Sequence, residues 1–274
     1  MDIITGEKIQ KMCDIYLGMD NDFLFNPVIK NESHKHMDLN HIIMPFDNPR
    51  IIFCYSNRIQ ILSQKIGFFM NPFTLVTHNS DQDVVDNYIS KNILNCKNLE
   101  LWYTQNPCFE HEKLVFLPIG IANSQWDHGN LSLFENDDFM KNNVKTKKVY
   151  FYFSIHTNPA KREKCYNSLI HRIEWLDSVS PIENFMRLKN YEFCVCPEGN
   201  GVDTHRLWEA IYVKTVPIVI KSKFTDILIK NNLPLVVIDD WSDLNIENLN
   251  YQDYNFDDSF YPSFIRLRNR ILGI

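Results

Sequence analysis

Short apolar segments alternate with longer polar segments along most of this chain, and this alternation restricts the folds open to it. Segments of five or six residues that are apolar on both faces are typical of buried parallel strands. Polar segments with helical spacing separate them, so the pattern predicts an α/β protein with parallel sheets. The expected strands lie in RIIFCYS (50–56), FTLVTHNS (73–80), NLELWYT (98–104), KLVFLPIG (113–120), KVYFYFS (148–154), YEFCVCP (191–197), VPIVI (216–220) and LPLVVID (233–239).

Helices are expected in the polar segments between these strands and at both ends of the chain. Near the amino terminus, Ile9, Met12, Cys13 and Tyr16 have the spacing of an amphipathic helix. At the other end, residues 261–274 read as a helix with Pro262 in its first turn. The remaining expected helices lie within 57–67, 81–92, 159–173, 203–215 and 222–232.

The strand–helix pattern occurs twice, on either side of a polar stretch. Residues 127–148 are rich in Asn, Asp and Lys and read as a linker. We therefore expect two Rossmann-like, doubly wound domains, 1–143 and 144–274, each of about 130 residues, with a cleft between them. Ligands of such sheets bind beyond the carboxyl ends of the strands.

Composition and charge narrow the classes of function. A net charge of −6 and the absence of a long basic run argue against nucleic acid as the main partner. The sequence contains neither an apolar segment long enough to span a bilayer nor a signal peptide, so a cytoplasmic location is expected. The seven cysteines are expected to be reduced and structural, although Cys194 and Cys196 would share one face of a strand.

The stretch CPEGNGVDTHRLWEA (196–210) holds two of only eight glycines in the chain. It reads as a strand end, a glycine turn and a helix that Asp203 or Thr204 could cap. Gly199 and Gly201 allow positive φ and let backbone amides approach a ligand. The partial positive charge at the helix start suits a phosphate.

The helix after this turn has two faces. Its first turns present His205, Arg206 and Glu209 towards the strand ends, where an arginine can pair with a diphosphate and a carboxylate can accept from ribose hydroxyls. The alternative is a simple Arg206–Glu209 pair at i, i+3. Dinucleotide-binding, phosphate-loop, serine-hydrolase and zinc-protease motifs are all missing from the sequence.

The segment 191–220 resembles the carboxyl-terminal signature of exostosin-like glycosyltransferases, family 47 of that enzyme class. Upstream, VTHNSD, WYTQNP, KLVFLPIGIANSQWDHG and FYFSIHTNPAKREKCY are similar to stretches of the compact members found in large DNA viruses. The resemblance covers most of the chain from Val76 to Ile220. It implies a GT-B fold, a nucleotide-sugar held by the rear domain, and transfer with inversion that needs no metal or other cofactor.

The resemblance also implies roles for individual residues. Glu209 would hold the ribose, and Arg206 with His205 would hold the diphosphate. Arg162 stands where this class commonly places a cation for the leaving group, although the same residue also reads as part of a solvated helix face. The other expected donor-binding residues are Asn158, Glu198, Gly199, Asn200, Gly201, Asp203 and Thr204.

An inverting displacement also needs a base for the acceptor hydroxyl. The loop after the strand at 73–78 offers His78 and Asp81, and we favour Asp81 because His78 lies at the strand end, where packing is its usual role. The alternative for Asp81 is a cap on a helix beginning near Asp83. The acceptor, a glycan or glycoprotein, is expected to meet Trp126, with Asp127 and His128 beside it.

Two other readings stay open. The acidic triplets DND (20–22) and DQD (81–83) could hold a divalent cation in a metal-dependent GT-A transferase. Alternatively, the chain is a glycan- or nucleotide-binding module without turnover. The default donor is a UDP-sugar; the residues do not distinguish the sugar or the acceptor linkage.

Overall fold

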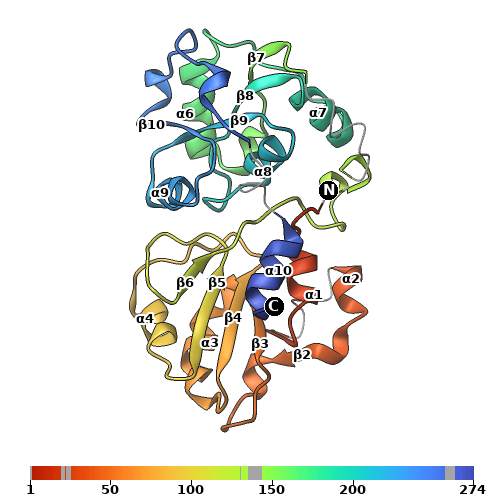
Figure 1. Cartoon of the computed structure of the whole chain (residues 1–274), viewed down its shortest axis with the longest axis vertical. Helices are drawn as coiled ribbons and strands as arrows, with labels where there is room; N and C mark the ends of the chain where they lie inside the picture. Colours follow the sequence, from red (N-terminus) through yellow and green to blue (C-terminus); the bar gives the residue numbers. More distant parts are fainter. Residues whose placement is uncertain (1, 20–21, 23–25, 130, 135–143, 257–262) are drawn as a thin grey trace. The chain divides into compact units, whose positions relative to one another are not determined.

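The structure is a computed structural model that describes residues 2–19, 22, 26–129, 131–134, 144–256 and 263–274 (Figure 1). Contacts divide the chain into two compact units. The amino-terminal unit comprises Asp2–Gln125 together with Ser263–Ile274, and the carboxyl-terminal unit comprises Trp126–Pro262. Each contains a parallel sheet packed against helices, which confirms the α/β class.

The sheet of the amino-terminal unit has six parallel strands in the order β2-β1-β3-β4-β5-β6. The chain adds β2 on one side of β1 and every later strand on the other side, which is the reversal that defines a doubly wound sheet. The strands are β1 (Ile15–Gly18), β2 (His36–Asp38), β3 (Ile51–Tyr55), β4 (Phe73–His78), β5 (Leu99–Thr104) and β6 (Leu114–Phe116).

The expected helix at 81–92 begins later than the sequence predicts. Val84 forms a bridge with Pro107, so this part of the loop is extended, and α4 (Tyr88–Leu94) starts only where Asn87 accepts from the amides of Ile89 and Ser90. The amino-terminal helix is also shorter than expected, because Tyr16 belongs to β1. The other helices here are α1 (Gly6–Lys11), α2 (Pro27–Lys30) and α3 (Ile59–Lys65).

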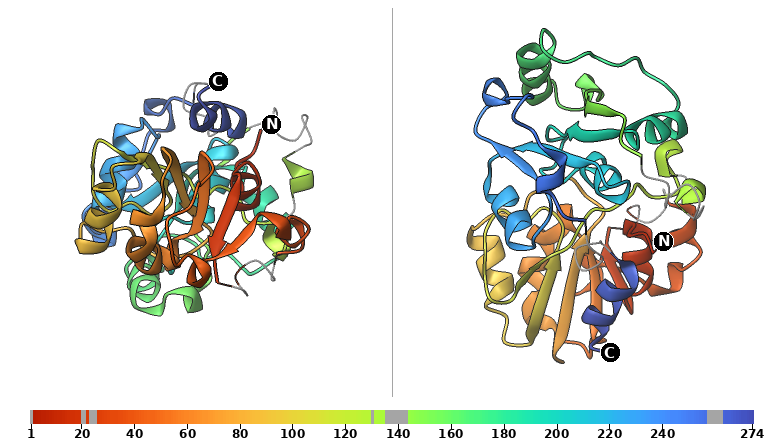
Figure 2. Two further views of the ribbon diagram at one scale, coloured as in Figure 1. Left: turned by 90° about the horizontal axis from the view of Figure 1, so that it is seen from below. Right: turned by 45° about the horizontal axis from the view of Figure 1, so that its top comes forward.

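The last helix, α10 (Phe264–Leu272), packs within the amino-terminal unit, beside α1 (Figures 1 and 2). Ser263 caps it, and Asp2 accepts from the Ser263 hydroxyl at 2.9 Å. The sequence had placed this helix in the rear domain. The expected boundary at Asn143 and the expected first-turn Pro262 both lie outside the described residues.

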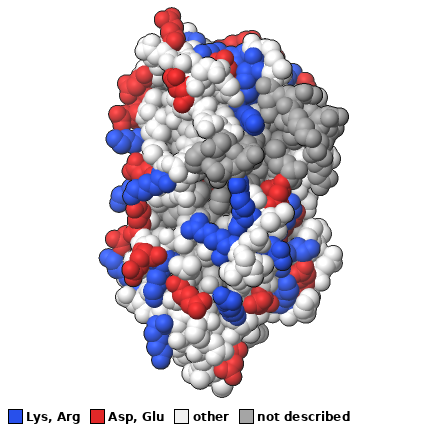
Figure 3. Space-filling view, in the orientation of Figure 1, with Lys and Arg blue, Asp and Glu red and all other residues white. Residues whose placement is uncertain are grey.

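The two faces of α10 differ sharply. Phe264, Leu267 and Ile271 pack into the core that contains Ile9 of α1. The arginines at 266, 268 and 270 are exposed, and basic side chains gather over this part of the surface in Figure 3. The helix is therefore amphipathic, and it holds the end of the chain against the first sheet.

The sheet of the carboxyl-terminal unit has four parallel strands in the order β10-β9-β8-β7, so the described strands are added in one direction. The strands are β7 (Lys147–Tyr150), β8 (Tyr191–Val195), β9 (Val216–Ile220) and β10 (Val236–Ile238), and the helices are α6 (Pro159–Leu169), α7 (Pro181–Leu188), α8 (His205–Tyr212) and α9 (Lys223–Lys230). Among the described residues, no helix has the length and apolarity needed to cross a membrane.

Helices cover both faces of this second sheet. Cys165 and Leu169 of α6 pack with Phe193 and Trp241 in one core. Arg206 of α8 lies over the ring of Tyr150, whose side chain points to the opposite face because side chains alternate along a strand. Part of the expected linker at 127–148 packs against the carboxyl-terminal unit, since the rings of Phe134 and of Phe185 in α7 have centroids 4.3 Å apart.

Candidate functional site

The loop between β8 and α8 lies at the carboxyl end of the second sheet, as the sequence predicts. Thr204 is the N-cap of α8, with φ of −130° and ψ of 143°, but its side chain makes no capping hydrogen bond. Asp203 is buried and accepts from Nε1 of Trp208 at 2.6 Å. Asp203 therefore links the loop to α8 through the indole of Trp208.

The two glycines of the turn do not have the conformation that the sequence suggests. Among the described glycines, positive φ occurs only at Gly120 and Gly273, so Gly199 and Gly201 are not selected for it. Space explains Gly199 instead, because a Cβ there would lie 3.3 Å from Nη2 of Arg162 and 3.5 Å from Cγ2 of Thr204. A side chain at this position would crowd the guanidinium.

Arg162 is buried, with 8% of its surface exposed, which excludes the solvated helix face. Its Nε donates to the carbonyl of Glu198 at 3.0 Å, and its Nη1 donates to the carbonyl of Ser154 at 2.7 Å. Burial lowers the pKa of Arg162, and the neighbouring Arg206 lowers it further. In the described part of the chain no carboxylate pairs with this guanidinium, so its charge is unbalanced.

Asn158 joins α6 to the same loop. Its Nδ2 donates to the carbonyl of Gly199 at 2.6 Å, while its Oδ1 accepts from the amide of Lys161 and caps α6. The side chain of Asn158 therefore links the turn at Gly199 to the start of α6, with its nitrogen on the turn and its oxygen on the helix.

Arg206 and Glu209 form the i, i+3 pair that the sequence allowed, with Nε donating to Oε2 at 2.9 Å. A second donor, Nη1 of Arg206, reaches the carbonyl of Tyr152 at 3.1 Å. Burial alone would lower the pKa of Arg206, but the charge of Glu209 raises it above its ordinary value. This guanidinium is thus balanced by a carboxylate, in contrast to Arg162.

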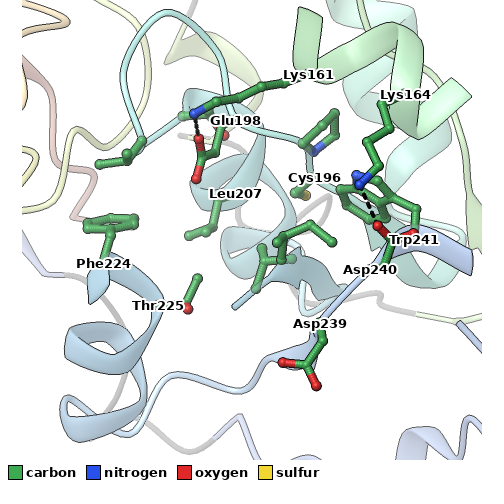
Figure 4. A pocket seen from close by; sticks show the side chains of 15 residues that line it. Lys161, Lys164, Cys196, Glu198, Leu207, Phe224, Thr225, Asp239, Asp240 and Trp241 are labelled. Carbon is green, nitrogen blue, oxygen red and sulfur yellow. Dashed lines mark hydrogen bonds and ion pairs between the residues drawn. The ribbon is translucent and has the colours of Figure 1, made fainter. Parts of the chain in front are cut away.

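A pocket of about 230 Å³ opens beside the loop, at the carboxyl ends of β8, β9 and β10 (Figure 4). Its interior is mostly apolar, and two ion pairs, Lys161–Glu198 and Lys164–Asp240, stand at its margin. The hydrogen bond from Lys164, together with those from Ser242, lowers the pKa of Asp240 to about 2. The lining residues are Lys161, Lys164, Cys196, Pro197, Glu198, Val202, Thr204, Leu207, Val219, Ile220, Phe224, Thr225, Asp239, Asp240 and Trp241.

Of the fifteen residues that line this pocket, only Glu198 and Thr204 are among the site residues predicted from the sequence. Phe224 and Thr225 follow β9, and Asp240 and Trp241 follow β10, yet none of them stands in a recognisable motif. The rule that ligands bind at the carboxyl ends of parallel strands, applied to every strand of the second half, would have found them.

Three neighbouring rings, those of His205, His128 and Trp126, form a series that begins at the start of α8. The ring of His128 lies 6.0 Å from that of His205, the first residue of α8. Trp126 stacks on His128 with centroids 6.4 Å apart and planes at 19°, and 55% of its surface is exposed. Trp126, Asp127 and His128 were expected in the front domain, but they belong to the carboxyl-terminal unit.

The two candidate bases of the amino-terminal unit have different surroundings. His78 is 1% exposed, and its Nδ1 and Nε2 lie 3.0 Å from Oδ1 of Asn79 and 3.1 Å from the carbonyl of Pro118. Asp81 is exposed on the loop, and because Asn87 caps α4, Asp81 is not the helix cap that the alternative required. Of the two side chains, Asp81 is exposed to solvent and His78 is buried.

A closed hydrogen-bond network surrounds His78. Asn79, with φ of 59°, donates from Nδ2 to Oε1 of Gln10 at 2.8 Å, and Gln10 in turn donates to the hydroxyl of Tyr55 at 2.9 Å. Beside it, the buried carboxylate of Glu7 accepts from Nδ2 of Asn26 and from the hydroxyl of Ser124.

In the first acidic triplet, Asp22 is already engaged in an ion pair. Both oxygens of Asp22 accept from Arg58, at 2.8 and 2.6 Å, and Asp20 of the same triplet lies outside the described residues. None of the seven cysteines forms a disulfide, and burial raises the pKa of the Cys196 thiol. The described residues contain no cluster of three or more potential metal ligands.

A comparison of the chain with protein-family models finds no matching family, and a search of curated proteins finds no match either. The exostosin-like resemblance therefore stays a prediction from the quoted motifs.

Proposed function

We propose that the chain is an inverting glycosyltransferase that moves a sugar from a nucleoside diphosphate, most simply UDP, to a hydroxyl of a glycan. The observation that carries this proposal is Arg162, a buried cation without a carboxylate partner in the described chain. Unpaired buried charge is costly, and it occurs where a ligand of opposite charge completes the site.

The surroundings of Arg162 favour a diphosphate as that ligand. Its Nη2 faces the space left open by Gly199 and lies near Thr204, where α8 begins. The first amides of a helix have no partner within the helix and carry a partial positive charge, which adds to the guanidinium. A phosphate at this position would receive both contributions.

The apolar pocket is the natural place for the nucleobase. Thr204 and Glu198 belong both to the turn and to the pocket lining, so a nucleotide with its phosphates at the turn reaches the pocket. Leu207 lines the pocket. Glu209 lies two residues later, about 200° further round α8, so it is on the side of the helix that faces away from the pocket. On this placement Glu209 holds Arg206 in position and does not bind the ribose.

The proposed reaction is a single displacement at the anomeric carbon. The acceptor oxygen attacks while the bond to the diphosphate breaks, and Arg162 with the start of α8 stabilises the charge that builds on the leaving phosphate. Asp81 is the proposed base for the acceptor proton. A GT-B arrangement of the two units, with no metal in the reaction, is part of this proposal.

The test is donor binding with and without Arg162. We expect UDP and at least one UDP-sugar to raise the melting temperature of the wild type, in excess EDTA as well as in Mg²⁺. Arg162→Gln should weaken UDP binding about 10- to 100-fold in isothermal titration calorimetry, because charged hydrogen bonds to the phosphate are lost.

Arg187→Gln is the matched control, since Arg187 lies on α7 of the same unit and pairs only with Glu183 at the surface in the contacts described. If neither UDP nor GDP nor their sugars bind the wild type, the proposal fails. An absolute requirement for a divalent cation would support the GT-A alternative, and binding without turnover would support the non-catalytic module.

A further inference from the structure

The ring series Trp126, His128 and His205 leads from the start of α8 to the surface of the carboxyl-terminal unit. Trp126 is the one tryptophan with a largely exposed ring in the described chain, whereas Trp102, Trp208 and Trp241 are buried. An exposed indole held flat by a stacked neighbour offers a rigid apolar face to a ligand at small entropic cost.

We propose that Trp126 is the platform for the transferred sugar of the donor, and that His128 is a positioning residue that holds the indole. This inference rests on the proposed nucleotide-sugar function. It reverses the sequence-based assignment of Trp126 to the acceptor, because the ring is built into the same unit as Arg162 and α8.

The order of groups along the donor supports this assignment. With the base in the apolar pocket and the diphosphate beside Arg162 and Thr204, the sugar leaves the diphosphate on the side opposite the base. His205 opens α8 directly after Thr204, and its ring connects through His128 to Trp126. An apolar pocket suits a planar base, while an exposed ring bordered by polar groups suits a sugar with one apolar face.

The neighbours of the indole also fit a polyhydroxylated ring. The exposed carboxylate of Asp127 and the imidazoles of His128 and His205 provide hydrogen-bond groups around the platform. An indole alone would also accept a nucleobase, so the two ligands must be separated by experiment.

The experiment compares UDP with the UDP-sugar that most stabilises the wild type in a panel of UDP-glucose, UDP-galactose, UDP-N-acetylglucosamine and UDP-glucuronate. We expect Trp126→Ala to weaken binding of the UDP-sugar about five- to tenfold while binding of UDP stays unchanged. His128→Ala should have a smaller effect in the same direction, and His128→Phe should restore it, because stacking rather than a hydrogen bond holds the indole.

Tyr88→Ala is the control for loss of an exposed ring, since Tyr88 is 69% exposed in the amino-terminal unit. Equal losses for UDP and the UDP-sugar would assign the platform to the base and overturn the inference. Unchanged binding of both ligands would also overturn it. Failure of the wild type to bind any of these probes would instead refute the proposed function itself, and the inference with it.

Discussion

The carboxyl ends of the two sheets are built from similar elements but differ in how their buried charged groups are partnered. In the amino-terminal unit, Asn79 contacts the buried His78 and donates to Gln10, and the buried carboxylate of Glu7 accepts from Asn26 and Ser124. In the carboxyl-terminal unit, Arg162 is buried without a carboxylate among the described residues, next to a pocket. A satisfied network stabilises a fold, whereas an unbalanced charge beside a cavity indicates a ligand.

Two glycines show the same contrast on a smaller scale. A Cβ at Gly6 would overlap Oδ1 of Asn79, so α1 and the end of β4 are in direct contact. A Cβ at Gly199 would lie 3.3 Å from the guanidinium of Arg162, whose flexible end could still shift. The first glycine permits close packing, and the second leaves room beside the end of the Arg162 side chain.

The largest expected effect concerns Asp81, an exposed carboxylate in the loop that follows β4 of the first sheet. Asp81→Asn should reduce sugar transfer about 100- to 10 000-fold, because the acceptor hydroxyl loses its base, while UDP affinity stays unchanged. Initial rates with the donor that the wild type uses would measure this. Asp86→Asn is the control, since Asp86 pairs with Lys91 at the surface; a full rate in Asp81→Asn would remove Asp81 from the mechanism.

Glu7 tests the structural side of the comparison. Glu7→Ala removes a buried acceptor from Asn26 and Ser124, so the free energy of unfolding should fall by about 3 kcal/mol. Urea denaturation would measure the loss, with the exposed Glu112→Ala as control. If the variant kept its stability but lost UDP affinity, the network would belong to the binding machinery.

Gly199 tests the binding side with the smallest change. Gly199→Ala should weaken UDP binding about three- to tenfold, because the new methyl group shifts the end of Arg162, and the melting temperature should change little. Gly67→Ala is the matched control, since a Cβ at Gly67 would meet nothing within 4 Å. Unchanged UDP affinity in Gly199→Ala would separate the turn from the ligand.

Strands were more predictable than the segments that join them. VPIVI (216–220) is apolar on both faces and forms β9 over the same residues, because burial from two sides leaves a local signature. The helix expected to begin at Asp81 begins only at Tyr88, because Val84 pairs with Pro107, which is 23 positions away along the chain. No local pattern reports a pairing of that kind.

Some local contacts of the candidate site were predictable from the sequence, but the placement of its residues was predictable only in part. The turn at Gly199 and the pair of Arg206 with Glu209 were legible because the residues are neighbours in sequence. Trp126 was assigned to the other domain, since the sequence offers no sign that its ring stacks on His128 towards α8.

The sequence by itself determined the α/β class, the parallel strands and the turn before α8, because periodicity and local spacing fix them. The tertiary structure alone decided which charged groups have a partner of opposite charge. Arg206 pairs with Glu209, whereas Arg162 has no carboxylate partner in the described chain. It also decided that His78 is buried against Asn79. The physical reason is that charge balance depends on distance and burial in space, which segments far apart in the sequence create together.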